Sequence, residues 1–250
     1  MTSFDIITNP DAPQIQVGKM ACDMTFEPKP PEPCPDKSFC WCIVGSRGSG
    51  KSTFLRSILS SKKKESRIYY KVFHSIIVCM PELSRKSMTP DPFKGIPRED
   101  IYEEFNEEFM DEVEQKVKEN AEEGIFTLLV FDDISNALRN NRTLENRITK
   151  LVHLSRHFLT STIFLIQKFK DIPNGIRQVC DLTTLFLPSN YQATEAFNNE
   201  YLKEYNREEQ KKLFDLVFKK KGDTLTIRKN IIPNKMYANL GHEIKVIPKK

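Results

Sequence analysis

An eight-residue segment with three glycines, a lysine and a hydroxyl residue has the spacing of a phosphate-binding loop. It runs from Gly45 to Ser52 and reads G-S-R-G-S-G-K-S. Glycine torsions allow the backbone N–H groups to turn inward around phosphate groups, and the following helix adds the positive end of its dipole. We expect nucleotide contacts from every residue of the loop and the one after it: Gly45, Ser46, Arg47, Gly48, Ser49, Gly50, Lys51, Ser52 and Thr53.

Two side chains of this loop have a specific chemical role to play. Lys51 is placed to reach the β- and γ-phosphates as a point charge. The hydroxyl of Ser52 is the expected ligand for Mg²⁺, and Thr53 is a less favoured substitute. The preceding run Phe39 to Val44 is apolar and β-prone, which indicates a buried strand leading into the loop. This context favours a phosphate site over the alternative, a glycine-rich surface turn with a chance lysine.

A second apolar run ends in two carboxylates. It reads F-T-L-L-V-F-D-D from Phe126 to Asp133, and Asp132 lies 81 residues after Lys51. This is the pattern of a Walker B strand, whose carboxyl end faces the ligand in α/β proteins. We expect Asp132 to hold Mg²⁺ opposite Ser52, and Asp133 to polarise an attacking water molecule.

A third buried strand is expected from Thr160 to Gln167, again with a polar residue at its end. Gln167 is a candidate contact for the γ-phosphate or the lytic water. The alternative is an amide that only caps the strand.

The remaining elements follow from hydrophobic periodicity. We expect helices over 51–59, 98–122 and 144–158, and two helical stretches within 192–220. Further strands are expected over 72–80, 181–187, 225–232 and 244–247, and Gly124 should end the long second helix. Such alternation of strands and helices predicts an α/β fold.

Length and composition fit one soluble α/β domain. The chain has 250 residues, 39% hydrophobic and 29% charged, and no apolar run long enough to span a membrane. No amino-terminal leader pattern is visible. The six cysteines form no C-x-x-C pair, and those in expected core strands indicate a reducing compartment. A zinc site from Cys22, Cys34, Cys40 and Cys42 is conceivable but poorly spaced.

Charge and proline are unevenly distributed. Residues 1–36 are expected to be a flexible, proline-rich lead-in, and 37–250 a single domain with a basic C-terminal part. Twelve acidic and two basic residues lie between Glu99 and Glu123, whereas thirteen basic and six acidic residues lie between Tyr201 and Lys250. The lysines at 62, 63 and 64 indicate either a solvated helix terminus or a nucleic-acid contact.

The motifs together resemble a known family. The segments G-S-R-G-S-G-K-S, S-I-I-V-C-M-P, L-L-V-F-D-D-I and L-S-R-H-F-L-T-S-T-I-F-L-I-Q are similar to those of genome-packaging ATPases. These enzymes occur in poxviruses, other nucleocytoplasmic large DNA viruses and virophages, and belong to the FtsK/HerA superfamily. The resemblance covers about residues 37–187.

The resemblance implies a fold and a set of further site residues. The fold is a three-layer P-loop NTPase of the additional-strand type, with a mainly parallel central sheet flanked by helices. The strand of Gln167 would lie between the Walker A and Walker B strands. Related motors act as rings in which an arginine reaches the nucleotide of the next subunit; Arg156 and Arg177 are the candidates, with Arg147 a third. Asp133 stands where FtsK-like motors commonly carry glutamate, so the expected base has a shorter side chain here.

The function implied is an ATP-hydrolysing motor that drives double-stranded viral DNA into a preformed capsid. Its cofactors would be ATP and Mg²⁺. Its partners would be DNA bound without sequence preference, further copies in a homo-oligomeric ring, and a capsid or vertex protein. The expected location is the host cytoplasm at the viral assembly site, and the virion. The alternatives are a nucleotide or small-molecule kinase, and a non-catalytic nucleotide-binding protein of the capsid vertex.

Overall fold

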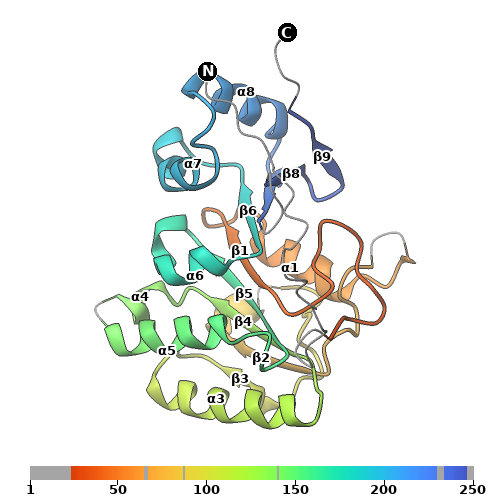
Figure 1. Cartoon of the computed structure of the whole chain (residues 1–250). Coiled ribbons are helices and arrows are strands. Elements are labelled where there is room, and N and C mark those ends of the chain that lie inside the picture. The colour runs from red at the N-terminus through yellow and green to blue at the C-terminus, as the bar shows by residue number, and fades with distance from the viewer. Residues whose placement is uncertain (1–23, 65–66, 87, 140, 230–233, 247–250) are drawn as a thin grey trace, which may run out of the picture.

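The computed structural model describes residues 24–64, 67–86, 88–139, 141–229 and 234–246. A single sheet runs through the molecule in the strand order β3-β2-β4-β5-β1-β6-β7-β8-β9 (Figure 1). Its strands are β1 (Cys40–Val44), β2 (Ser75–Cys79), β3 (Ile101–Tyr102), β4 (Thr127–Asp132), β5 (Thr160–Ile166), β6 (Leu182–Phe186), β7 (Thr224–Arg228), β8 (Lys235–Ala238) and β9 (His242–Ile244).

The first six strands are parallel, and β7, β8 and β9 continue the sheet in antiparallel fashion. Strand β5 pairs with β1 on one side and with β4 on the other. The strand that ends before Gln167 therefore lies between the Walker A and Walker B strands, which confirms the additional-strand prediction. Because β1, β4 and β5 are parallel neighbours, their carboxyl ends meet at one edge of the sheet.

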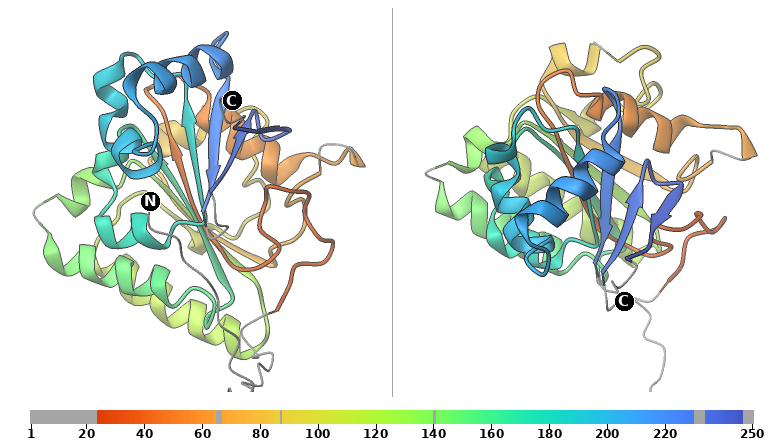
Figure 2. Two further views of the ribbon diagram at one scale, coloured as in Figure 1. Left: turned by 45° about the horizontal axis from the view of Figure 1, so that its top comes forward. Right: turned by 90° about the horizontal axis from the view of Figure 1, so that it is seen from above.

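Helices cover both faces of the sheet, as Figures 1 and 2 show. They are α1 (Lys51–Ser60), α2 (Glu82–Lys86), α3 (Glu107–Glu122), α4 (Ser135–Leu138), α5 (Arg142–His153), α6 (Asn174–Val179), α7 (Glu195–Tyr201) and α8 (Arg207–Val217). Single 3₁₀ turns lie at Arg98–Asp100, Phe169–Asp171 and Tyr191–Thr194.

Alternating side chains divide the interior into two apolar cores. On β1, Cys40 and Cys42 face the core that contains α3 and α5, whereas Trp41 and Ile43 face the core that contains α1. This period of two is what a strand buried on both faces produces. The predicted three-layer, mainly parallel fold is confirmed.

The long helix expected over 98–122 is shorter in the structure. Residues 98–102 form a 3₁₀ turn and the edge strand β3, and α3 begins only at Glu107. The side chain of Asn106 accepts the N–H of Phe109 at 2.9 Å and so caps the helix. The buried side chains of α3 pack on the sheet, with the Phe109 and Phe131 rings 6.0 Å apart. Gly124 follows the helix at φ 72°, as a C-terminal glycine should.

The end of another helix also differs from the expectation, and the C-terminal strands join the main sheet. Helix α5 ends at His153 rather than at residue 158, because the chain turns there and reaches β5 through Leu159 at φ 46°. The basic C-terminal part belongs to the packed domain, since β7, β8 and β9 extend the central sheet and Leu225 of β7 is fully buried.

The packed body begins before the expected boundary at residue 37. Phe26 is 1% exposed and packs edge-on against the ring of Phe126 at 4.9 Å. The side chain of Glu32 forms ion pairs with Arg228 at 3.2 Å and Lys235 at 3.1 Å. Residues 24–36 thus lie against the domain, because one aromatic anchor and one charged anchor hold the proline-rich segment in place; residues 1–23 are outside the described part.

None of the helices in the described ranges combines the length and the apolar character needed to cross a bilayer.

Candidate nucleotide-hydrolysis site

The loop between β1 and α1 has the backbone of a phosphate cradle. Gly48 and Gly50 adopt φ 72° and φ 113°, which side chains disfavour. Glycine torsions do not explain the need for Gly45, because its φ is not positive. A Cβ added there would lie 2.4 Å from Ser49 Oγ and 2.9 Å from Phe186 Cβ, so the strand end and the loop meet only if residue 45 has no side chain.

The side chain of Lys51 is folded back into this loop. Its Nζ donates to the carbonyl oxygens of Gly45 at 2.6 Å and Ser46 at 3.2 Å. Burial lowers the pKa of Lys51, while the carboxylates of Asp132 and Asp133 act in the opposite direction. The ammonium group is therefore held at the mouth of the loop by two carbonyl oxygens and faces two carboxylates.

A cavity of about 330 Å³ opens beside the start of α1. Its walls are Gly48, Ser49, Gly50, Lys51, Ser52, Thr53, Arg56, Met88 and Thr89. The guanidinium of Arg56 donates to the carbonyl oxygen of Thr89, which joins α1 to the segment after α2. Arg56, Met88 and Thr89 were not expected from the sequence, because no motif connects residues from two such separate segments.

The two carboxylates lie at the end of β4. Burial raises the pKa of Asp132 to about 6, with Asp133 adding to the shift, while Lys51 and a hydrogen bond from Ser84 oppose it. Asp133 adopts φ 57°, an uncommon conformation for a residue with a side chain, and its N–H donates to the carbonyl oxygen of Leu165 on β5. Ser84 of α2 is another site residue that sequence reasoning missed.

Gln167 joins the site from the end of β5. Its Nε2 lies 3.5 Å from Oδ2 of Asp133. The loop itself is tied to the same strand, because the N–H of Gly45 donates to the carbonyl oxygen of Ile166 at 3.0 Å. Lys51, Asp132, Asp133 and Gln167 are thereby brought to one edge of the sheet from three neighbouring strands.

These residues fit a nucleotide with its magnesium ion. The glycine cradle would be filled by a side chain at residue 45, and the Ser49 hydroxyl is buried without a hydrogen-bond partner in the described structure. A serine hydroxyl and a carboxylate are hard oxygen ligands of the kind that Mg²⁺ prefers. Ser46 and Arg47 lie on the exposed side of the loop.

The three candidate arginines lie outside this cluster. Arg147 forms ion pairs with Asp111 at 2.7 Å and Glu114 at 3.1 Å, joining α5 to α3. Arg177 pairs with Glu200 at 2.9 Å, and its guanidinium stacks over Phe169. Arg156 is exposed in the turn before β5, at the opposite end of that strand from Gln167.

Among the described cysteines, Cys34 does not join Cys40 and Cys42 in the grouping considered from the sequence. Cys40, Cys42 and Cys180 are brought together in one core, with the Sγ atoms of Cys42 and Cys180 2.9 Å apart. Cys34 lies in the other core, and Cys22 is outside the described residues.

Solved structures with the same fold include viral packaging ATPases. The DNA-packaging ATPase B204 of Sulfolobus turreted icosahedral virus is 16% identical with a TM-score of 0.56, covering 79% of this chain and 96% of that one. B204 of Sulfolobus turreted icosahedral virus 2, in complex with ATP-gammaS, is 15% identical with a TM-score of 0.54, covering 84% and 98%. ATPases 2 and 3 of EssC from Geobacillus thermodenitrificans are 11% identical with a TM-score of 0.52, covering 77% of this chain and 38% of that one.

At these identities the likeness establishes the fold alone. A comparison with curated protein sequences found no match. The family model of the poxvirus A32 protein, however, matches residues 33–239, which is most of the chain and includes the whole site. This match confirms the resemblance to the packaging ATPases of poxviruses. The chain therefore belongs to the poxvirus A32 protein family.

Proposed function

We propose that this protein is an ATP-hydrolysing motor that moves double-stranded viral DNA into a preformed capsid. The observation that carries the proposal is the meeting of Lys51, Asp132 and Gln167 at the carboxyl ends of β1, β4 and β5, three adjacent strands. Membership of the poxvirus A32 family supports a role in genome packaging and virion assembly. The B204 structures with bound nucleotides support ATP as the ligand of this loop.

Each group in the site has a distinct task. The loop N–H groups and Lys51 hold the phosphates of ATP, replacing the carbonyl contacts that Lys51 makes in this structure. Ser52 and Asp132 would hold Mg²⁺, which neutralises charge on the phosphate oxygens when it is bound. Binding of a cation next to Asp132 favours the ionised carboxylate, so it opposes the rise in pKa that burial causes.

Asp133 and Gln167 favour water as the nucleophile. Each residue follows the end of a strand, and Asp133 comes directly after Asp132, the expected metal ligand. Their contact at 3.5 Å uses one carboxylate oxygen of Asp133 and the amide nitrogen of Gln167, so the other carboxylate oxygen and the amide oxygen can orient one water molecule. A kinase would need a pocket for an acceptor beside the γ-phosphate. Six of the nine residues that line the cavity at the loop belong to the expected phosphate-binding segment, and the paired carboxylates and amide at the strand ends suit a water nucleophile better than a bound acceptor.

The motor would work on DNA as an assembly. A homo-oligomeric ring would allow an arginine of one subunit to reach the nucleotide of the next, and Arg156 is the candidate that no ion pair holds among the described residues. DNA would be held through its phosphates without sequence preference. The assembly site in the host cytoplasm, and the virion, are the expected places of action, with a capsid or vertex protein as partner.

Steady-state ATP hydrolysis with and without long double-stranded DNA tests the proposal. We expect turnover that DNA stimulates, with less stimulation as salt rises. Lys51→Ala should abolish turnover, whereas the control Lys94→Ala, at an exposed lysine outside the site, should leave it unchanged. Phosphoryl transfer to an acceptor would indicate a kinase. Nucleotide binding without turnover, also with DNA present, would indicate a non-catalytic vertex protein.

A further inference from the structure

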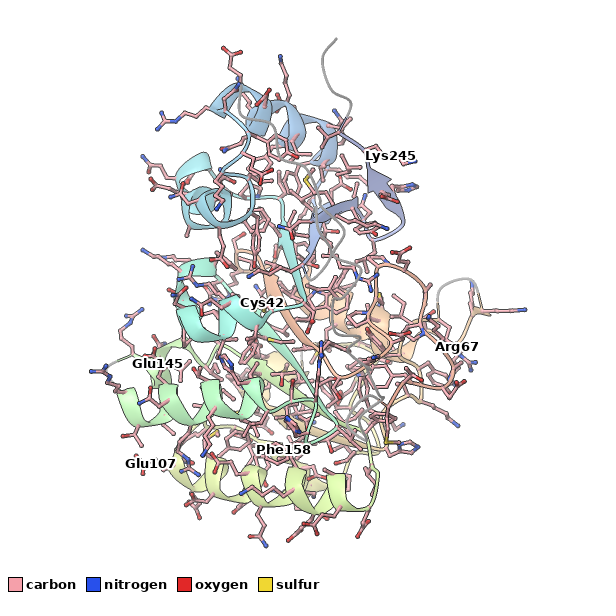
Figure 3. All side chains as sticks on the ribbon, in the orientation of Figure 1. Cys42, Arg67, Glu107, Glu145, Phe158 and Lys245 are labelled. Carbon is pink, nitrogen blue, oxygen red and sulfur yellow. The ribbon has the colours of Figure 1, made fainter. Side chains whose placement is uncertain are left out.

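A cluster of cations surrounds one aromatic ring on the segment after α1. Lys62 Nζ, Arg67 Cζ and Lys71 Nζ lie 5.9, 5.3 and 5.8 Å from the centroid of the Tyr70 ring. All three cationic residues are exposed. Figure 3 shows Arg67 at the outer edge of the molecule, away from the helices α3 and α5. We call these four residues the Tyr70 cluster.

The Tyr70 cluster is not neutralised within the described part of the protein. Across those residues, no carboxylate forms an ion pair with Lys62, Arg67 or Lys71. Asp36, whose charge acts on the neighbouring Tyr69, is itself paired with Lys29 at 3.0 Å. Three like charges around one ring repel one another, and an anion placed between them removes that repulsion.

The segment that carries the cluster is anchored to the domain. Tyr69 is 1% exposed, its ring stacks on Phe39 at 5.1 Å, and its hydroxyl donates to the carbonyl oxygen of Pro35. The next residue, Tyr70, is half-buried. Lys71 adopts φ 59°, an uncommon conformation that turns the chain back toward the core at Val72. The two residues of the cluster that follow Tyr69, Tyr70 and Lys71, thus lie next to an anchored part of the chain.

The same anchor connects the cluster to the nucleotide site. The N–H of Tyr69 donates to the carbonyl oxygen of Ile58 near the end of α1, the helix that begins with Lys51. The ten residues of α1 span about 15 Å. Both ends of one helix therefore carry cations, one group at the nucleotide loop and the other at the Tyr70 cluster.

We propose that the Tyr70 cluster is a contact surface for the phosphate backbone of double-stranded DNA. The inference rests on the proposed function, and it names a surface through which the motor would hold its substrate. Point charges on flexible side chains suit phosphates and read no base sequence. Tyr70 keeps those charges together, because each cation is attracted to the ring. Within the basic C-terminal part, Arg228 and Lys235 of the sheet both face Glu32, so these two charges are partly neutralised.

The test compares two triple variants of the full chain with the same loss of charge. One is Lys62→Gln/Arg67→Gln/Lys71→Gln, and the control is Lys203→Gln/Lys211→Gln/Lys212→Gln, at exposed positions on and next to α8. The affinity for a 30-base-pair duplex is measured by fluorescence anisotropy between 50 and 200 mM salt. Basal hydrolysis without DNA shows that both variants are folded.

We expect the cluster variant to bind the duplex at least about tenfold more weakly at 0.1 M salt, with a salt slope smaller by about two to three. The control variant should change far less, and Tyr70→Phe, which keeps the ring, should bind like the unaltered protein. Equal losses in the two triple variants would overturn the inference and leave the proposed motor intact.

Two further outcomes would also decide against the assignment. If the unaltered chain does not bind the duplex, both the inference and the DNA part of the proposed function are wrong. Equal losses in the two triple variants would contradict the inference alone. If vesicles rich in phosphatidylserine bind through the cluster while the duplex does not compete, the surface is a membrane contact instead.

Discussion

The amide of Gln167 lies 3.5 Å from the carboxylate of Asp133, and this contact joins the ends of β5 and β4. The distance is at the long limit of a hydrogen bond, so the pair is held by its strands more than by the contact itself. Asp133 is fixed by the left-handed conformation of its backbone and by its N–H bond to Leu165. The two polar groups are therefore oriented before any water molecule binds.

Replacing Gln167 should reduce turnover without loosening the nucleotide. In Gln167→Ala we expect kcat to fall by about tenfold to a hundredfold, because the proposed mechanism assigns Gln167 as one of two groups that orient the attacking water. The KM for ATP should stay within about twofold, since the phosphate contacts come from the loop and Lys51. Gln115→Ala, at a glutamine paired with Glu119 on the exposed side of α3, is the control. A rise in KM at constant kcat would show that Gln167 only binds the phosphates.

Two glycines of the loop should respond differently to alanine. Gly45→Ala places a Cβ within 2.4 Å of Ser49 Oγ and 2.9 Å of Phe186 Cβ, so the loop must shift away from β1. Gly48→Ala meets nothing within 4 Å and only strains φ at 72°, at a cost of about 1–2 kcal/mol. Calorimetric titration with ATP should therefore show a larger loss of affinity for Gly45→Ala. Equal losses would mean that backbone torsion, not space, decides both positions.

The sequence predicted the parts of the fold in which the hydrophobic pattern of a segment matches its burial in the folded protein. The strands β1, β4 and β5 are largely apolar runs. A glycine loop follows β1, β4 ends in a carboxylate, and Gln167 follows β5, so their position in a buried parallel sheet and the chemistry at their ends could both be expected. The order of β5 between β1 and β4 came from the family resemblance, because periodicity says nothing about which strands pair.

The remaining parts depend on contacts that no local pattern encodes. The apolar spacing of Ile101 and Phe105 suits a helix, yet Asn106 caps a later start and Ile101 pairs with Val78. The sequence places Phe26 in the proline-rich lead-in, but in the structure its ring packs against the rings of Tyr69, Phe73 and Phe126. Ser84 and Arg56 join the site only through the folded chain, since neither belongs to a motif.

The ion pairs of Glu32 should make the attachment of residues 24–36 depend on pH. Its hydrogen bond and charge interaction with Lys235 lower the pKa of Glu32 below its ordinary value, with Arg228 contributing. A lowered pKa in the folded state gives stabilisation that is present above the unfolded value and is lost as the pH falls through the folded one. Because the group is exposed, the effect on the free energy of unfolding should stay below about 1 kcal/mol.

Hydrogen exchange of the segment around Cys34 measures this attachment. In the unaltered protein, protection should fall as the pH drops from 6 toward 3, after correction for intrinsic exchange. Glu32→Gln should show the lower protection already at pH 6. Glu27→Gln, at a residue of the same segment for which no ion pair is described, is the control. A pH response that persists in Glu32→Gln would assign it to another group.

Among the candidate arginines, Arg147 should act on stability alone. Arg147→Ala removes the pairs with Asp111 and Glu114 and should lower the free energy of unfolding by about 1 kcal/mol, measured by urea denaturation. Turnover per folded molecule should not change. A loss of turnover at full stability would make Arg147 the residue that acts between subunits.

Arg156 should act on the neighbouring subunit's nucleotide. It lies at the far end of β5 from Gln167, and a strand of seven residues spans about 20 Å, so it does not reach the site of its own chain.

Arg156→Ala and Lys51→Ala should each be inactive in the DNA-stimulated assembly. In a ring mixed at random from the two, about a quarter of the interfaces combine an intact Lys51 with an intact Arg156, and turnover should reappear. The control mixture pairs Lys51→Ala with Asp132→Ala, both defects being within one site, and it should stay inactive. Absence of recovery in the first mixture would leave Arg156 as a surface residue.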